Sequence, residues 1–163
     1  MTSSALPSES VTLRLADETA TERLAGRVAD LTQPGDVIAL EGELGVGKTR
    51  FARAFIGRLA GEQEVPSPTF TLVQTYDSPV APIWHFDLYR LADPDEALEL
   101  GIEEAFGGGI SLIEWPERLG PHLPEERLDI GLAFAEEGPE ARTASLTGRG
   151  RWAPRVAFLA NHG

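Results

Sequence analysis

The chain of 163 residues contains no cysteine, a single lysine and no long run of apolar residues. Without cysteine there can be no disulfide framework, thiolate zinc site or cysteine nucleophile. Without a long apolar run, no helix is expected to cross a membrane. The N-terminus has neither a basic start nor an apolar core, so it does not read as a secretory signal. We therefore expect a cytoplasmic protein with no membrane contact.

Positive charge is scarce throughout the sequence. The chain has 14 Lys+Arg against 26 Asp+Glu, which gives a net charge of -12. Proteins that bind nucleic acid neutralise phosphates with Lys and Arg, and no such cluster is evident here. The densest basic segment, GRGRWAPR at 148–155, is interpreted as a solvated end of the domain. We therefore expect no direct binding of RNA or DNA.

The remaining sequence predicts one α/β domain over 1–163, with the Ser-rich residues 1–10 as a loose tail. Helical spacing of apolar residues, together with Asp17 and Asp93 as N-caps, predicts helices over 17–31, 48–61 and 93–106. Short apolar or alternating runs predict strands at 11–15, 36–40, 69–76, from 83, and at 110–115, 127–134, 141–148 and 155–160. We expect a mixed sheet, antiparallel in its later strands, with helices on both sides.

The segment GELGVGKT matches the phosphate-binding loop pattern G-x-x-x-x-G-K-[ST]. Its glycines let the backbone wrap closely around phosphates, and the N-terminus of the following helix supplies inward N–H groups and a favourable dipole. A buried strand precedes the segment and an amphipathic helix follows it, as this loop requires. The residues predicted to cradle a nucleotide are Gly42, Glu43, Leu44, Gly45, Val46, Gly47, Lys48 and Thr49.

Lys48 is the only lysine of the chain and stands at the phosphate-contacting position of the loop. Its ammonium is a compact point charge on a flexible stem, whereas the planar fork of arginine has a different shape and donor geometry. The sequence uses arginine at its other basic positions, so the placement of this lysine favours nucleotide binding over a chance glycine-rich turn. The hydroxyl of Thr49 is predicted to bind Mg²⁺.

Two acidic residues end neighbouring apolar runs and are candidates for the magnesium side of the site. Asp87 ends IWHFD and Glu114 ends ISLIE. Ligands gather at the carboxyl ends of parallel strands, so either acid can face the loop. Asp87 can instead start a turn, and Glu114 can instead be a partly exposed acid beside a Trp-Pro bend. His85, inside the first run, is interpreted as a packed core histidine rather than a ligand.

The residues alone leave several kinds of nucleotide protein open. The guanine-recognition motif Asn-Lys-x-Asp needs a second lysine, so ATP is expected rather than GTP. A small kinase fits the length, but between Arg58 and Arg118 the only arginine is Arg90, which is sparse for a phosphate-binding lid. A binding module whose partner affinity is set by ATP is a further alternative.

Four blocks in order, GELGVGKTRFARAF, SPTFTLVQTY, HFDLYRLADPDEALELGIEE and LIEWPERL, make the chain resemble the TsaE (YjeE) family over roughly 36–120. This resemblance implies a weak ATPase that assists the synthesis of threonylcarbamoyladenosine in tRNA. The transfer itself would be done by a TsaD–TsaB pair, which TsaE binds to permit repeated cycles. Contact with tRNA would then be only indirect.

The resemblance also implies roles for individual residues. Lys48 would contact the phosphates, Thr49 and Glu114 would bind Mg²⁺, and Asp87 would orient water or the metal. Thr69, in the block beginning at Ser67, would sense the γ-phosphate, and Trp115 would lie beside the nucleotide. Residues 17–21 are a further expectation for contact with the base. Lys48, Asp87 and Glu114 are therefore the predicted catalytic residues.

Overall fold

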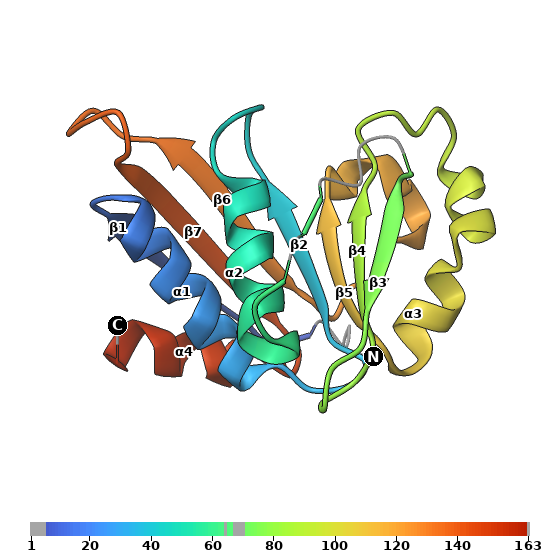
Figure 1. The fold of residues 1–163 in the computed structure, drawn as a ribbon. Helices are drawn as coiled ribbons and strands as arrows, with labels where there is room; N and C mark the ends of the chain where they lie inside the picture. The colour runs from blue at the N-terminus through green and yellow to red at the C-terminus, as the bar shows by residue number, and fades with distance from the viewer. Residues whose placement is uncertain (1–5, 64, 67–70, 163) are drawn as a thin grey trace.

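The computed structural model describes residues 6–63, 65–66 and 71–162, which form one seven-stranded mixed sheet with helices on both faces (Figure 1). The strand order is β1-β7-β6-β2-β5-β4-β3. In chain order the elements are β1 (Ser8–Leu15), α1 (Glu18–Leu31), β2 (Val37–Glu41), α2 (Lys48–Ala60), β3 (Val73–Tyr76), β4 (Ile83–Asp87), the 3₁₀ helix η1 (Pro94–Leu100), α3 (Ile102–Gly108), β5 (Ile110–Glu114), the 3₁₀ helix η2 (Pro116–His122), β6 (Leu128–Phe134), β7 (Arg142–Arg149) and α4 (Trp152–His162). The predicted α/β class is confirmed.

Four parallel strands, β6, β2, β5 and β4, make the centre of the sheet. All five residues of β5 and the first four of β2 are buried, as expected for strands covered on both faces. The outer strands β3, β7 and β1 pair antiparallel with their neighbours. The expectation that the later strands are antiparallel is confirmed for β7, which pairs antiparallel with β6 and β1, but β6 itself runs parallel to β2. As a result, β2, β4, β5 and β6 all end at one edge of the sheet.

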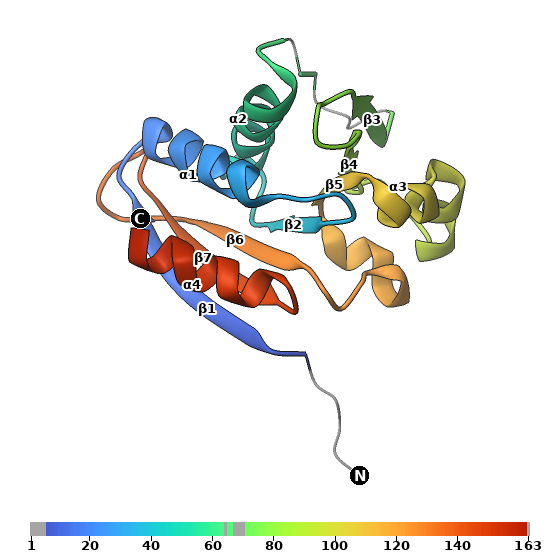
Figure 2. The same ribbon diagram turned by 90° about the horizontal axis from the view of Figure 1, so that it is seen from below.

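Helices α1 and α2 cover one face of the sheet and α4 covers the other (Figure 2). Phe51 and Phe55 of α2 are completely buried. On the opposite face, Trp152 of α4 is buried against β7, where Gly148 allows close approach because a Cβ there would collide with the Trp152 carbonyl. Among the residues that the structure describes, no helix is both long enough and apolar enough to cross a bilayer.

Two predictions at the C-terminal end of the chain are wrong. Residues 155–160, predicted as a strand, lie within α4, where Val156 and Leu159 are buried at helical spacing. The GRGRWAPR segment is not a solvated end, because Trp152 is 1% exposed. The side chain of Arg155 lies over the Trp152 ring, 4.6 Å from its centroid, and is itself only 13% exposed.

Several element boundaries also differ from the prediction. The first strand begins at Ser8 and not at 11, since the whole of β1 pairs with β7, and so residues 8–10 are not a loose tail. β3 begins at Val73, and the predicted strand residues 69 and 70 lie outside the described part of the chain. The N-cap at Asp93 is confirmed, and Glu96 completes a capping box with it, but the predicted helix is divided by Gly101, which adopts a left-handed conformation.

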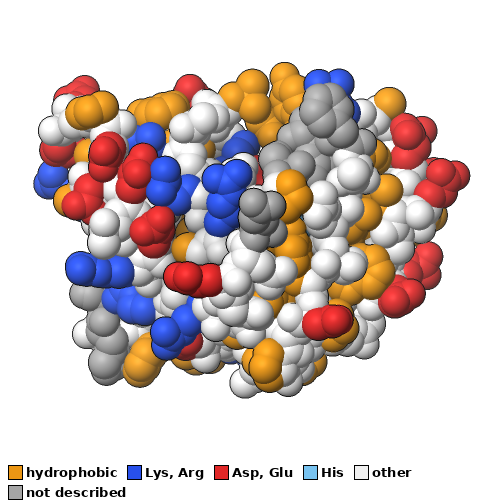
Figure 3. Space-filling model, in the orientation of Figure 1, with side chains coloured by type: hydrophobic (Ala, Val, Ile, Leu, Met, Phe, Trp, Pro, Cys, Tyr) orange, Lys and Arg blue, Asp and Glu red, His pale blue; other side chains and the backbone are white. Residues whose placement is uncertain are grey.

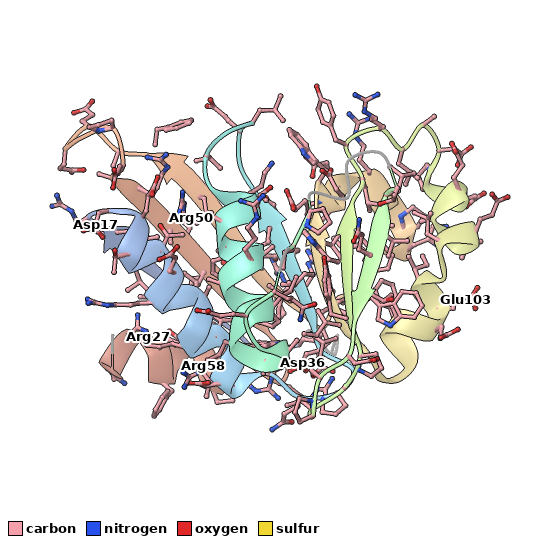
Figure 4. All side chains as sticks on the ribbon, in the orientation of Figure 1. Asp17, Arg27, Asp36, Arg50, Arg58 and Glu103 are labelled. Atoms are coloured by element: carbon pink, nitrogen blue, oxygen red, sulfur yellow. The ribbon has the colours of Figure 1, made fainter. Side chains whose placement is uncertain are left out.

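A buried ion pair attaches α4 to the start of β2. Its acid, Asp36, lies at the edge of the sheet opposite the loop after β2 (Figure 4). The Asp36 carboxylate is 1% exposed, lies 2.5 Å from Arg155 and 3.4 Å from Arg151, and accepts a hydrogen bond from the Gln33 N–H. A carboxylate so deeply buried depends on these partners, because an unpaired buried charge is costly.

We predict that Arg155→Ala lowers the free energy of unfolding by about 3 kcal/mol, since it leaves the buried Asp36 carboxylate undercompensated. Urea denaturation followed by circular dichroism measures this loss. The matched control is Arg14→Ala, which breaks an exposed pair with Glu137 and should cost less than about 0.5 kcal/mol. Equal losses in the two variants would contradict the assignment.

Candidate nucleotide site

The loop between β2 and α2 has the backbone geometry of a cradle. Gly42, Gly45 and Gly47 have φ values of 143°, 80° and 121°, a region that side chains disfavour. At Gly42 there is also no room, since a Cβ would lie 2.5 Å from the Leu132 carbonyl oxygen. The loop therefore lies close against β6, and its conformation depends on glycine at this position.

The first turn of α2 offers N–H groups without a competing side chain. Its N-cap is Gly47, which provides no side-chain cap, and the first turn contains no acidic residue. The first four N–H groups of a helix have no partner within it, and they carry the positive end of the helix dipole. This end of α2 is therefore suited to phosphate oxygens.

Asp87 and Glu114 lie opposite each other, at the ends of the parallel strands β4 and β5. They are 6% and 3% exposed. The interpretation of Glu114 as a partly exposed acid is thus wrong. Asp87 does form a turn, because its Oδ1 accepts a hydrogen bond of 3.1 Å from the Tyr89 N–H. It nonetheless lines the same cavity as Glu114, so the turn leaves Asp87 at the cavity, and its role beside Mg²⁺ stays a prediction.

A cavity of about 310 Å³ brings together the glycine-rich loop, the start of α2 and both acids. Besides three residues of the loop, the predicted site residues Lys48 and Thr49 at the start of α2 and Asp87, Glu114 and Trp115 at the ends of β4 and β5 all line it. The full lining is Leu44, Gly45, Gly47, Lys48, Thr49, Arg50, Arg53, Asp87, Tyr89, Glu114 and Trp115. The parallel sheet thus assembles one polar cavity from segments that are distant in the sequence.

Lys48 is buried in this cavity, with 5% of its surface exposed. Its Nζ donates a hydrogen bond of 2.5 Å to the Gly42 carbonyl and lies 3.8 Å from the centroid of the Trp115 ring. Burial lowers the pKa of Lys48, and the negative charges of Glu114 and Asp87 oppose this lowering. Burial therefore outweighs the two carboxylates and disfavours the charged form of Lys48. A bound phosphate would add negative charge beside the ammonium and favour the charged form.

Trp115 occupies a strained position beside the loop. Its φ of 60° is left-handed, which is uncommon for a residue with a bulky side chain. The ring packs against Tyr89, with centroids 4.9 Å apart. Sequence reasoning missed Tyr89, although its place two residues after Asp87 puts it at the same edge of the sheet.

Sequence reasoning also missed the partner of His85. The residue is a buried core histidine, as expected, but its Nε2 lies 2.7 Å from Oε2 of Glu114. Period-two alternation in IWHFD places His85 on the same face of β4 as Asp87, but it does not identify Glu114 on β5 as the partner.

Some predicted residues lie apart from the cavity. Thr69 lies outside the described residues. Glu43 is exposed on the loop, and Val46 is buried beneath it. Of residues 17–21, Thr19 and Ala20 line a separate groove of about 1200 Å³ between α1 and α2, and Arg53 lines both this groove and the cavity. Contact between residues 17–21 and a base stays a prediction.

The donor set is compatible with Mg²⁺, although the described residues contain no group of three His, Asp or Glu side chains able to hold a metal alone. Mg²⁺ beside phosphates is held by one or two carboxylates, the phosphate oxygens and water, rather than by an all-protein cage. The Thr49 hydroxyl and one of the two buried carboxylates suit this arrangement.

Comparison with known proteins identifies the family of the chain. A family model described as "Threonylcarbamoyl adenosine biosynthesis protein TsaE" matches residues 15–144. The chain belongs to the TsaE family. A TsaE protein from Rickettsia bellii is 42% identical, covering 82% of this chain and 92% of its own, and one from Bacillus subtilis is 40% identical, covering 80% of each. The crystal structure of Bacillus subtilis YdiB superimposes with a TM-score of 0.78 at 31% identity, covering 96% of this chain and 97% of that chain.

We predict that Gly42→Ala destabilises the protein by at least about 2 kcal/mol, because it adds backbone strain to a clash with the carbonyl of Leu132. The control is Gly57→Ala, in the interior of α2, where a Cβ meets nothing within 4 Å. It should stabilise the protein by about 0.5–1 kcal/mol through helix propensity. Chemical denaturation of both variants measures the contrast, and a similar effect of the two changes would refute the close approach of the loop to β6.

We also predict that Lys48→Met makes the nucleotide-free protein no less stable at neutral pH. Because burial lowers the pKa of Lys48, the protonated amine weakens folding relative to a neutral side chain at any pH below the folded-state pKa. The advantage of Lys48→Met should shrink as the pH rises through that pKa, where the wild-type amine loses its proton.

Thermal melts between pH 7 and pH 10 measure this dependence. The control is Arg50→Met, which removes a cation that is 42% exposed on the same helix and should change the stability by less than about 0.5 kcal/mol at any pH. A loss of stability in Lys48→Met that is largest at pH 7 would contradict the sign of the shift.

Proposed function

We propose that this chain binds ATP with Mg²⁺, hydrolyses it slowly, and acts as an accessory protein in the synthesis of threonylcarbamoyladenosine in tRNA. The observation that carries the proposal is the convergence of Lys48, Asp87 and Glu114 on one cavity at the N-terminus of α2. Membership of the TsaE family supports the pathway. ATP is favoured over GTP because the sequence has no second lysine for a guanine-recognition motif.

Each side chain of the cavity has a distinct part in this proposal. The N–H groups of the loop and of the first turn of α2 would hold the β- and γ-phosphates. The Lys48 ammonium would move from the Gly42 carbonyl to the phosphates, which compensate its charge better. Thr49 and Glu114 would hold Mg²⁺, which neutralises charge on the phosphates when bound. Asp87, fixed by the Tyr89 N–H, would orient the attacking water.

Slow hydrolysis is expected because the two arginines that line the cavity already bind other groups of the chain. Arg50 forms ion pairs with Glu18 and Glu22, at 3.0 and 3.2 Å. Arg53 donates a hydrogen bond of 3.1 Å to the Val65 carbonyl. Within the described part of the chain, neither arginine lining the cavity is thus held toward the loop as an arginine finger, a group that accelerates such reactions by about 10³–10⁵-fold.

The partner in this proposal is a protein pair, TsaD–TsaB, which would carry out the transfer to tRNA. The net charge of -12 disfavours direct binding of RNA. Figure 3 shows that acidic side chains gather over η1 and α3, and that acidic and basic side chains alternate over α1 and α2. Several of the latter are ion-paired, as in Arg58 with Asp30. Contact with tRNA would therefore be indirect, through the partner proteins.

Calorimetric titration with ATP and Mg²⁺ tests the site directly. Wild type should bind, and Lys48→Met should bind at least about 100-fold more weakly, because a charge-assisted contact to phosphate is lost. Arg58→Met, outside the cavity, is the matched control and should bind as wild type does. Unchanged affinity in Lys48→Met would overturn the assignment of the site.

Product analysis separates an ATPase from the alternative of a small kinase. The proposal expects inorganic phosphate as the sole product that carries the γ-phosphoryl group. Transfer of that group to a small-molecule acceptor would favour the kinase.

Reconstitution with TsaD and TsaB tests the role in the pathway. Modification of tRNA should stall near one turnover per transferase without this chain and continue when the chain and ATP are added. Lys48→Met should fail to restore turnover, whereas Arg58→Met should restore it. Multiple turnovers in the absence of the chain would contradict the proposed accessory role.

A further inference from the structure

The carboxylate of Glu114 is held by one buried side chain, His85. Nε2 of His85 lies 2.7 Å from Oε2 of Glu114, and the two side chains are 0% and 4% exposed. An ionised carboxylate can only accept hydrogen bonds, so Nε2 carries the hydrogen and donates it. The pair is thus an oriented contact that is shielded from water.

The sheet register sets this contact. Asp87 lies directly opposite Glu114, and His85 lies directly opposite Leu112, two residues earlier on β5. His85 and Glu114 are therefore diagonal neighbours on one face, within reach of a long side chain and a ring. Leu112 and Ile83 of this face are fully buried and belong to the same core cluster as Phe51 and Phe55 of α2, so the pair lies on a buried face of the sheet.

Packing alone does not account for a histidine at this position. A buried imidazole costs free energy unless its polar atoms are paired. Within the described residues, Nδ1 of His85 has no hydrogen-bond partner. The contact with Glu114 is therefore the compensation that the structure provides for burying the ring. An apolar side chain, like that of neighbouring Phe86, would fill the space without this cost.

We propose that His85 is a positioning residue for Glu114. By holding Oε2, it fixes the rotamer of the carboxylate and leaves Oε1 for Mg²⁺ or a water bound to it. Asp87 is held differently, by the backbone N–H of Tyr89. The inference rests on the proposed function, since it assigns a role to His85 within that magnesium site. Partners that orient ligating side chains commonly contribute about 10–100-fold to metal affinity.

The test measures metal affinity rather than turnover. Mn²⁺, a paramagnetic substitute for Mg²⁺, is titrated by electron paramagnetic resonance into the protein bound to a non-hydrolysable ATP analogue. His85→Leu should weaken Mn²⁺ binding by about 10–100-fold. Affinity for the analogue in EDTA should stay within about twofold, because the loop and Lys48 are unchanged.

A conservative variant and a burial control sharpen the test. His85→Gln should recover most of the Mn²⁺ affinity, because its side-chain amide places a donor near the position of Nε2. His85→Asn is one methylene shorter and should not recover it; this variant replaces His85→Leu if that protein does not fold. The burial control is Ser111→Ala. Ser111 is also fully buried and polar, but it precedes Glu114 by three residues on β5 and so lies on the opposite face of the sheet. This change should leave the Mn²⁺ affinity unaltered.

A double-variant cycle distinguishes positioning from a general structural role. In a Glu114→Ala background, His85→Leu should cause no further loss of Mn²⁺ affinity, since its effect passes through Glu114. Additive losses would overturn the inference, as would wild-type Mn²⁺ affinity in His85→Leu or an equal loss of analogue affinity in EDTA. If the wild-type protein itself binds neither the analogue nor Mn²⁺, the proposed function fails and the inference fails with it.

Discussion

The positive charge of Lys48 lies buried between a carbonyl oxygen, an aromatic ring and two carboxylates, and the rest of the site is arranged around it. A buried ammonium is stable only with partners, and here each partner comes from a different segment. Gly42 belongs to the loop, Asp87 and Glu114 end β4 and β5, and Trp115 follows β5. The parallel register of β2, β5 and β4 is what brings these segments to one edge of the sheet.

The groups around Lys48 are themselves held in place by contacts that do not involve a ligand. Glu114 accepts from His85, and Asp87 accepts from the Tyr89 N–H. The loop is held against β6 because Gly42 carries no side chain. The cavity is therefore largely shaped without a ligand, and preorganisation of this kind lowers the entropic cost of binding the proposed nucleotide.

The two edges of the sheet serve different purposes. The carboxyl edge holds the cavity, whereas the opposite edge holds the buried pair of Asp36 and Arg155 that attaches α4. The GRGRWAPR segment belongs to this second edge, where its arginines neutralise acids of the same chain. The arginines of this segment thus stabilise the fold of the chain itself. In the proposed function, the excess negative charge of the surface would contact a protein partner.

Local sequence patterns were sufficient for features that depend on near neighbours. The loop glycines, the lone lysine, the N-cap at Asp93 and the apolar runs of β2 and β5 predicted the α/β class and most of the cavity lining, because backbone conformation and burial periodicity are set within a few residues. Tertiary structure decided what depends on residues far apart. The helix at 152–162 replaced a predicted strand because its apolar face packs on β1 and β7, and β1 extends back to Ser8 because β7 offers partners that far. The pairing of His85 with Glu114, 29 positions away, exists only because β4 and β5 lie side by side, which no local pattern specifies.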